Sequence, residues 1–361
     1  MSAEPRAGAV TIDLDDVGGL LDADRDGLLR AASMAGAQMR STAAAFDEGV
    51  FEPMRSDHPP RTVIWVAGSG TAAAAGALLV AALGASTVAP IVTASEVPPW
   101  VGALDVLVVA GDDAADPALV TAVATGVRRG ARVLVVAPEE GPLRDAAAGR
   151  AVLLGPRLPV PDDFSLARYL AAGLLLLHVV DPGMQVDVAA LADELDAEAL
   201  RNSAGRDVFT NPAKALADRM SDATVVVAGE GAPMLALARH VSAVLLRVGL
   251  RPMTSVGLAD VLVSLRGGLN RQTTDFETSI FHDEELDGPL PTRVRAIVLT
   301  ADQDRPTTLS RLSGYDDVTT TSAGDVGDTA APPPSGRLEQ QLAMLAVRLE
   351  MAAVYLRLVR G

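Results

Sequence analysis

A short pattern that occurs twice is the most restrictive feature of this chain. The segment 66–70 (Val-Ala-Gly-Ser-Gly) returns at 227–231 as Val-Ala-Gly-Glu-Gly. Each copy ends an apolar run and begins an Ala- and Leu-rich segment, which is the pattern of a strand, a turn and a helix. Gly68 and Gly229 are 161 positions apart (229 minus 68). That spacing leaves room for a complete α/β unit in each half, so the sequence predicts two lobes.

Both glycine turns are candidates for ligand binding. A turn of small residues between the end of a strand and the start of a helix lets backbone N–H groups approach a ligand, often an anionic one. We therefore expect a site between the two lobes to which both turns contribute. The candidate ligand-binding residues are Ser69, Gly70 and Thr71 in the first turn and Gly229, Glu230 and Gly231 in the second.

Composition excludes several classes of function. The chain has 361 residues, of which 49% are hydrophobic, enough for two cores. Its 30 basic and 46 acidic residues give a net charge of -16, which disfavours binding to nucleic acid or to an anionic membrane. Cysteine is absent, so no disulfide, cysteine-metal site or cysteine nucleophile is available. Residues 1–10 have no apolar core of a secretory signal, and we expect a cytoplasmic protein.

One uncharged stretch leaves a membrane alternative open. Residues 62–95 carry no charge, and this length exceeds what a membrane-spanning helix needs. Glycine and proline interrupt the stretch, however, and its ends are rich in β-branched residues. We favour a buried strand at 63–66, a helix at 71–83 and a second buried strand at 87–92.

Alternating strands and helices predict an α/β fold with two parallel sheets, each flanked by helices in a Rossmann-like three-layer arrangement. The expected organisation is a helical N-terminal segment at 1–59, a first lobe at 60–185, and a second lobe at 186–361 that includes a C-terminal helix. Further expected strands lie at 105–109, 132–136, 152–154, 223–227 and 293–299. Residues 322–335 have the composition of an exposed linker. An apolar repeat at helical spacing predicts an amphipathic helix docked on a lobe or on a second subunit, and we favour docking within the chain; its members are Leu338, Leu342, Leu345, Leu349, Ala352 and Leu356.

The first glycine turn also fits a dinucleotide fingerprint. Residues 68–73 match the G-x-G-x-x-A form, and a strand is expected before them. The acidic residue that would bind a ribose is expected about twenty residues later, and the nearest candidate, Glu96, is farther away. In the second copy Glu230 places a carboxylate where pyrophosphate would lie. A dinucleotide-dependent oxidoreductase is therefore the lesser alternative.

The chain resembles the SIS-fold phosphoglucose/phosphomannose isomerases of bacteria and archaea, over most of its length. The resemblance is closest to a divergent actinobacterial subgroup near mannose-phosphate metabolism. It rests on the order of six features: the turn at 66–72; the strand at 106–109 with its polar loop; the Arg-Arg-Gly-Ala turn at 128–131; Asn-Pro-Ala-Lys at 211–214 with Ala217; Ala238 with Arg239; and Phe-His-Asp at 281–283 ahead of 293–295. It implies two five-stranded lobes, a homodimer, a sugar phosphate or related small molecule as ligand, and aldose–ketose chemistry without metal or organic cofactor.

The chain departs from this family in its phosphate-binding loop. The family has a stretch of hydroxyl residues there, whereas this chain has Asp112 and Asp113. We keep both as candidate ligand-binding residues. Carboxylates close to a dianionic phosphate would repel it.

The expected catalytic groups are also missing. Aldose–ketose isomerisation needs a base that moves a proton between C1 and C2, and an acid that opens the ring. The family has a glutamate in the helix after the second glycine turn, a histidine one segment later and a lysine near the end of the chain. Residues 241–248 contain no carboxylate, residues 255–270 no histidine, and the last residues are Arg360 and Gly361. The possible substitutes are Glu230, His240 and His282. We therefore expect a binding or regulatory protein with weakened or lost isomerase activity, and keep active isomerisation by relocated residues as the alternative.

Overall fold

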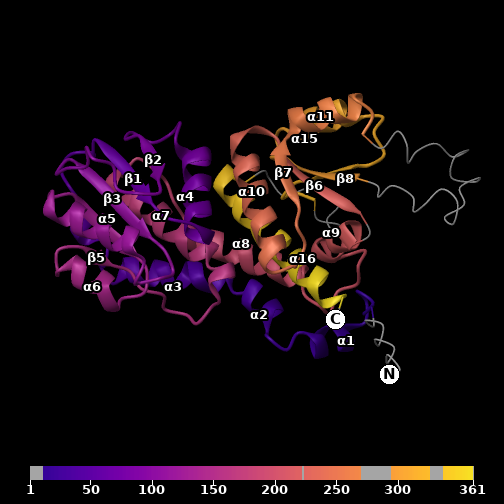
Figure 1. Cartoon of the computed structure of the whole chain (residues 1–361), viewed down its shortest axis with the longest axis horizontal. Coiled ribbons are helices and arrows are strands. Elements are labelled where there is room, and N and C mark those ends of the chain that lie inside the picture. Colours follow the sequence, from indigo (N-terminus) through magenta and orange to yellow (C-terminus); the bar gives the residue numbers. More distant parts are fainter. Residues whose placement is uncertain (1–10, 222, 270–293, 326–335, 361) are drawn as a thin grey trace, which may run out of the picture.

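The computed structural model describes residues 11–221, 223–269, 294–325 and 336–360. They form two lobes that lie side by side, with a long C-terminal helix between them (Figure 1). His282, one of the predicted catalytic substitutes, lies outside the described residues, as do the predicted strand start at 293 and most of the predicted linker.

Lobe 1 is a parallel five-stranded sheet in the order β2-β1-β3-β4-β5. Its strands are β1 (Thr62–Val66), β2 (Ile91–Ala94), β3 (Asp105–Ala110), β4 (Arg132–Val136) and β5 (Val152–Leu153). Successive side chains point to opposite faces, so Val63 and Trp65 join one core while Ile64 and Val66 join another. Both faces are apolar because helices cover both of them. The helices are α3 (Ala35–Asp47), α4 (Gly70–Leu83) and α7 (Leu166–Val180) on one side, and α5 (Pro117–Arg128) and α6 (Gly141–Ala147) on the other.

Lobe 2 repeats this plan with four parallel strands in its described part, in the order β7-β6-β8-β9. These are β6 (Thr224–Gly229), β7 (Thr254–Gly257), β8 (Val294–Leu299) and β9 (Val318–Thr321). One face packs on α9 (Pro212–Ser221), α10 (Gly231–Arg247) and α16 (Leu338–Leu358), and the other on α11 (Leu258–Arg266) and α15 (Arg305–Leu312). The predicted α/β class with two parallel sheets flanked by helices is confirmed.

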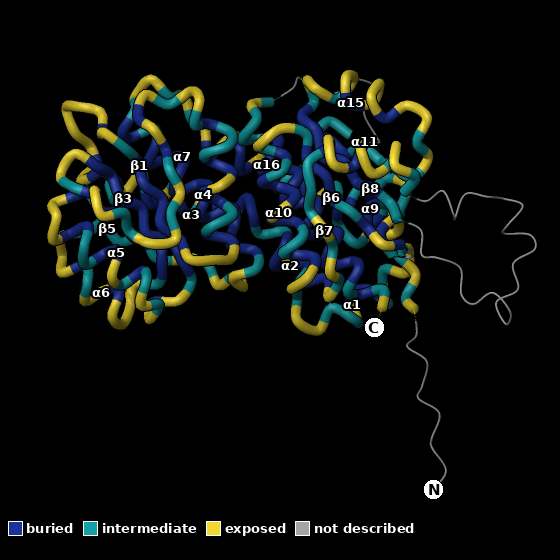
Figure 2. The backbone as a smooth tube through the Cα atoms, turned by 45° about the horizontal axis from the view of Figure 1, so that its top comes forward, coloured by how far each residue is buried: buried dark blue, intermediate teal, exposed yellow. Residues whose placement is uncertain are grey.

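The C-terminal helix α16 is central rather than peripheral. Of its 21 residues 17 are buried, on all sides of the helix, so the amphipathic pattern predicted from its leucines is wrong. The reason is that α16 contacts both lobes, through α4 on one side and through α8 (Val188–Arg201), α9 and α10 on the other. The short N-terminal helices α1 (Val17–Ala23) and α2 (Leu28–Ala32) pack on it as well. Figure 2 shows buried backbone inside both lobes and exposed backbone around their rims.

A buried ion pair fixes α16 to α8. Arg348 and Glu198 are each fully buried, and Arg348 Nε donates to Glu198 Oε1 over 2.7 Å. The other oxygen of Glu198 accepts from Arg201 at 2.8 Å, and Arg348 also donates to the carbonyl groups of Ser322 and Ala323. Burial alone would raise the pKa of Glu198, but Arg348 and Arg201 together hold that pKa below its ordinary value. The glutamate is therefore charged, and its charge is balanced inside the protein.

The uncharged stretch 62–95 is not a single helix. It contains β1, the 14-residue helix α4 and β2, in the predicted order. The second strand is Ile91–Ala94 rather than 87–92, and only Ile91 in it is buried, because β2 is an edge strand of the sheet. No described helix is long and apolar enough to cross a membrane.

We predict that Arg348→Met destabilises the protein by about 3 kcal/mol, because Glu198 would keep its charge in the interior and lose its main partner. The free energy of unfolding from urea titrations measures this effect. Arg357→Met on the same helix is the matched control, since Arg357 pairs with Asp26 in an exposed ion pair and should matter by less than about 1 kcal/mol. Equal effects of the two substitutions would show that the buried pair does not anchor the helix.

Candidate functional site

The two glycine turns have the same backbone geometry. Gly70 and Gly231 are the first residues of α4 and α10, and both have positive φ, at 69° and 74°. L-residues with a side chain rarely adopt this conformation, so glycine is required at both places. A Cβ atom on Gly229 would lie 2.2 Å from the backbone nitrogen of Leu235, which also excludes a side chain there. The sequence repeat therefore corresponds to a repeated strand-to-helix turn with a glycine at positive φ.

The structure does not bring the two turns together. Arg247, the last residue of α10, pairs with Asp163 at 2.5 Å, and the neighbouring Asp162 accepts a hydrogen bond from Thr71 in the first turn of α4. The end of α10 thus lies beside the start of α4. Since the 17 residues of α10 span about 25 Å, Gly231 is at the far end of this helix pair. Each turn belongs to its own lobe, and the described residues do not bring the two turns into one site.

In the first turn, the hydroxyl of Thr71 is already bound. Thr71 is buried, and its Oγ1 lies 3.0 Å from the carbonyl oxygen of Asp162 and 2.8 Å from the hydroxyl of Ser165. These contacts tie the turn to the start of α7. Ser69 and Gly70 are exposed, and Ser69 makes no side-chain hydrogen bond to the helix end. Of the three candidates, Ser69 and Gly70 face solvent and Thr71 has a structural bond.

The two aspartates of the acidic loop after β3 have different surroundings. Asp112 is directed towards α7, where its Oδ1 accepts from Arg168 Nη2 at 3.0 Å and from the hydroxyl of Tyr169. Asp113 is exposed and accepts from the backbone N–H of Ala115 at 2.8 Å, as in a local turn. Only Asp112 is part of a side-chain cluster.

This cluster borders a cavity of about 160 Å³ at the carboxyl edge of sheet 1. Arg168 and Tyr169 come from the first turn of α7, and the guanidinium carbon lies 4.3 Å from the centre of the tyrosine ring. Burial raises the pKa of the Tyr169 hydroxyl, so it stays protonated and donates to Asp112. The pKa of Asp162 on the cavity wall is also raised, first by burial and then by the charge of Asp112.

Sequence reasoning missed Arg168 and Tyr169. A usable signal was present, because Arg168 is the only arginine or lysine in the otherwise apolar helix α7. A charged residue in such a helix needs a buried partner, and here the partner is Asp112.

The catalytic substitutes lie apart from this cluster. Glu230 precedes α10 and its Oε1 pairs with Arg311 of α15 at 2.7 Å, inside lobe 2. His240 is buried and its Nε2 lies 2.9 Å from Oε1 of Glu350, which is buried on α16. Glu230 and His240 therefore have different partners, and neither side chain contacts Asp112. Among the described residues no group of three or more His, Asp or Glu side chains could hold a metal ion.

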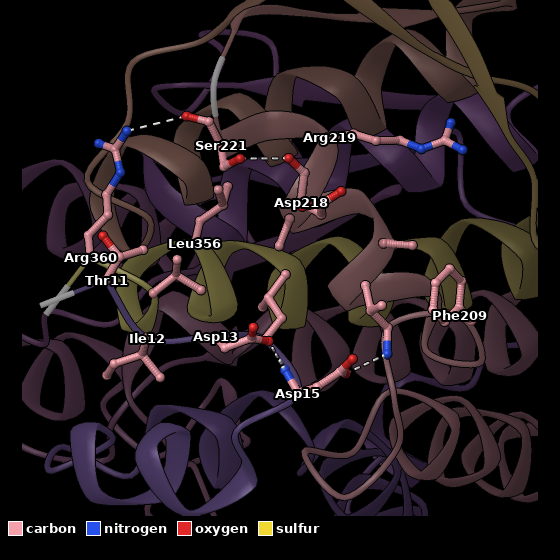
Figure 3. A pocket seen from close by; sticks show the side chains of 15 residues that line it. Thr11, Ile12, Asp13, Asp15, Phe209, Asp218, Arg219, Ser221, Leu356 and Arg360 are labelled. Carbon is pink, nitrogen blue, oxygen red and sulfur yellow. Dashed lines mark hydrogen bonds between the residues drawn. The ribbon is translucent and has the colours of Figure 1, made fainter.

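A larger cavity, of about 830 Å³, lies between the start of the described chain, α9 and the end of α16 (Figure 3). Residues from the N-terminal segment, α9 and the end of α16 line it, among them Asp13, Asp15, Phe209, Asp218 and Leu356. None of the candidate catalytic or ligand-binding residues that the structure describes is part of its wall.

Comparisons with known proteins show the fold. No family model matches the chain, and no curated protein matches it in sequence. Solved structures do match. The tagatose-6-phosphate ketose/aldose isomerase of Escherichia coli is 15% identical, with a TM-score of 0.60 over 98% of this chain and 95% of that one. The chain has the SIS fold.

Two further solved structures give the same result. The C-terminal domain of glucosamine-fructose-6-phosphate aminotransferase from Francisella tularensis is 10% identical, with a TM-score of 0.58 over 94% of this chain and 98% of that domain. A glucose-6-phosphate isomerase like protein from Thermus thermophilus is 18% identical, with a TM-score of 0.54 over 97% of this chain and 96% of that one. At these identities the likeness concerns the SIS fold and not the activity.

We predict that Thr71→Val destabilises the protein by about 1 kcal/mol, because the buried Thr71 hydroxyl would no longer form hydrogen bonds with the Asp162 carbonyl and the Ser165 hydroxyl. Ser69→Ala, two residues earlier and exposed, is the control and should stay within about 0.5 kcal/mol. Thermal unfolding of both variants makes the comparison. If Thr71→Val proved as stable as Ser69→Ala, the Thr71 hydroxyl would be free to serve a ligand.

Proposed function

We propose that this chain is an SIS-type binding or regulatory protein for a carbohydrate derivative, with weakened or lost isomerase activity. We propose that it is related to the glucose-6-phosphate/mannose-6-phosphate isomerases. Within that family it would belong to the divergent actinobacterial subgroup near mannose-phosphate metabolism. The proposal keeps the cytoplasmic location that the composition indicates, the homodimer that the resemblance implies, and a site free of metal and organic cofactor.

The observation that carries the proposal is the position of Asp112. This carboxylate lies in the loop that supplies phosphate-binding hydroxyls in the family that the chain resembles, and it is held there by Arg168 and Tyr169. The Thr71 hydroxyl, the other candidate phosphate ligand, is bound to Asp162 and Ser165. A phosphate at this edge would have to compete with the Asp112 carboxylate for the Arg168 guanidinium and would gain no free hydroxyl from Thr71.

The proton-transfer groups support the same proposal. Helix α10 contains no carboxylate, so the glutamate that the resemblance implies has no counterpart in it. His240 and Glu350 satisfy each other in the interior, at 3% and 4% exposure, and neither can reach a sugar without opening the helix packing. A base and an acid placed on one substrate are both required for isomerisation.

The second candidate function is active isomerisation with Glu230 as the base. One observation favours it. Glu230 Oε2 is buried and has no hydrogen-bond partner in the described part of the chain, while Oε1 is held by Arg311. A carboxylate oriented through one oxygen, with the other unbound, has the form of a general base.

We predict no conversion of fructose 6-phosphate to glucose 6-phosphate or mannose 6-phosphate above background. Coupled assays on purified protein measure it. Glu230→Gln, prepared in the same host by the same steps, is the matched control, because both preparations carry the same contaminating isomerase. Equal rates support the proposal. A wild-type rate at least tenfold above that of Glu230→Gln would contradict it and assign the base.

A further inference from the structure

The amino edge of sheet 1 carries a group of arginines. The strands of this sheet are parallel, so the residues that precede them lie at one edge, opposite the edge of Asp112. Arginines lie at or just before the start of β1, β4 and β5, and Arg132 at the start of β4 also donates to the carbonyl of Met54 at 2.6 Å, next to a further arginine. We name this group the arginine edge; its members are Arg55, Arg61, Arg128, Arg129, Arg132 and Arg150.

The arginine edge is a positively charged surface on a chain whose net charge is -16. Two of its members pair with carboxylates, Arg55 with Glu52 and Arg61 with the buried Asp105. The other four form no ion pair with a described residue. Four positive charges at one edge of the sheet are thus available to an acidic partner.

An exposed tryptophan is held in place among these arginines. Trp100 is 48% exposed, and the guanidinium carbon of Arg61 lies 5.7 Å from the centre of its ring. Arg61 Nη2 also donates to the carbonyl of Trp100 at 3.0 Å, and Arg129 Nη1 donates to the carbonyl groups of Pro99 and Val101 on either side. Because these bonds already order the loop, a partner that covers the ring would lose little free energy in immobilising it.

Leu104 adds a second exposed apolar side chain to this surface. It is 69% exposed, and its carbonyl accepts from the backbone N–H of Arg61 at 2.8 Å. Tryptophan and arginine are enriched at the residues that dominate binding between proteins, whereas lysine and the acidic residues are depleted there. The cavities beside Asp112 and Asp13 contain no residue of this surface. An open surface of this composition suits an extended protein segment better than a small molecule.

We propose that the arginine edge binds an acidic segment of another protein, with an apolar side chain of that segment on Trp100 and Leu104 and its carboxylates paired with the arginines. Charge complementarity carries the choice of partner, and the exposed ring and leucine require that the partner also be apolar in part. Nucleic acid fits less well, because the net negative charge of the chain would repel its many phosphates. The inference concerns the opposite edge of lobe 1 from Asp112 and does not depend on the proposed function.

The first test titrates the full chain with a copolymer of glutamate and tyrosine and measures protection of tryptophan fluorescence from acrylamide. The chain has two tryptophans, and Trp65 is buried, so acrylamide quenches mainly Trp100. We expect saturable protection that weakens at high salt, and none with polylysine. Absence of protection by the copolymer, or equal protection by polylysine, overturns the inference.

The second test reverses charges and follows the fluorescence anisotropy of labelled copolymer. Arg128→Glu/Arg150→Glu changes two exposed members of the arginine edge, and we expect the affinity to fall at least tenfold. Arg30→Glu/Arg266→Glu, two exposed residues outside lobe 1, changes the net charge equally and is the matched control, expected within twofold of wild type. Equal losses in both double variants would show a response to net charge alone and overturn the inference.

The third test examines the apolar contact by the same anisotropy measurement. Trp100→Ala keeps every arginine and removes the ring, and we expect it to weaken binding of the copolymer at least fivefold. Unchanged affinity would reduce the surface to a site for any anion and overturn the inference.

Two further measurements separate the other occupants. A short DNA duplex should bind more weakly than the copolymer, and sedimentation velocity should give the same oligomeric state for wild type and for Arg128→Glu/Arg150→Glu. DNA binding as tight as that of the copolymer, lost in this variant, would assign the edge to nucleic acid and overturn the inference. A wild-type oligomer that the variant dissociates would make the edge an interface between copies of this chain and overturn it as well.

Discussion

The buried pair between Arg348 and Glu198 is the constraint on which the arrangement of both lobes depends. A charged pair inside an apolar helix layer is tolerated only when each partner is satisfied, and here Arg201 and two carbonyl groups complete it. These contacts hold α16 in its position against α8. With α16 fixed, α4 and α10 pack against it from the two lobes. The apolar core then extends without interruption from one lobe to the other.

That packing separates the two glycine turns, so the carboxyl edges of the two sheets have different side-chain environments. At the edge of lobe 1, Asp112, Arg168 and Tyr169 form a closed hydrogen-bonded cluster beside a small cavity. At the edge of lobe 2, Glu230 is bound by Arg311. Each lobe has a glycine turn whose backbone N–H groups could bind an anion. A carboxylate nevertheless lies near the turn in each lobe. The fold is that of solved phosphosugar isomerases.

Sequence patterns predicted the fold well because strand and helix periodicity and glycine turns are local properties. The parallel sheets and the equivalence of Gly70 and Gly231 followed from them. The candidate site was harder to predict, since contacts between distant segments determine it. Asp112 was identified as a departure, but its partner Arg168 lies 56 positions away on a helix that periodicity describes only as apolar. The leucine spacing of α16 likewise could not reveal that a second layer of helices covers its other faces.

The central claim is that an SIS fold persists here without the proton transfer of an isomerase. Incubation of fructose 6-phosphate with the protein in D₂O tests this most directly, because any base that moves a proton between C1 and C2 exchanges it with solvent. Proton NMR should show no deuterium at C1 or C2 beyond that seen with a preparation of Glu230→Gln. Deuterium incorporation that increases with the amount of wild-type protein, and is absent with that variant, would contradict the account.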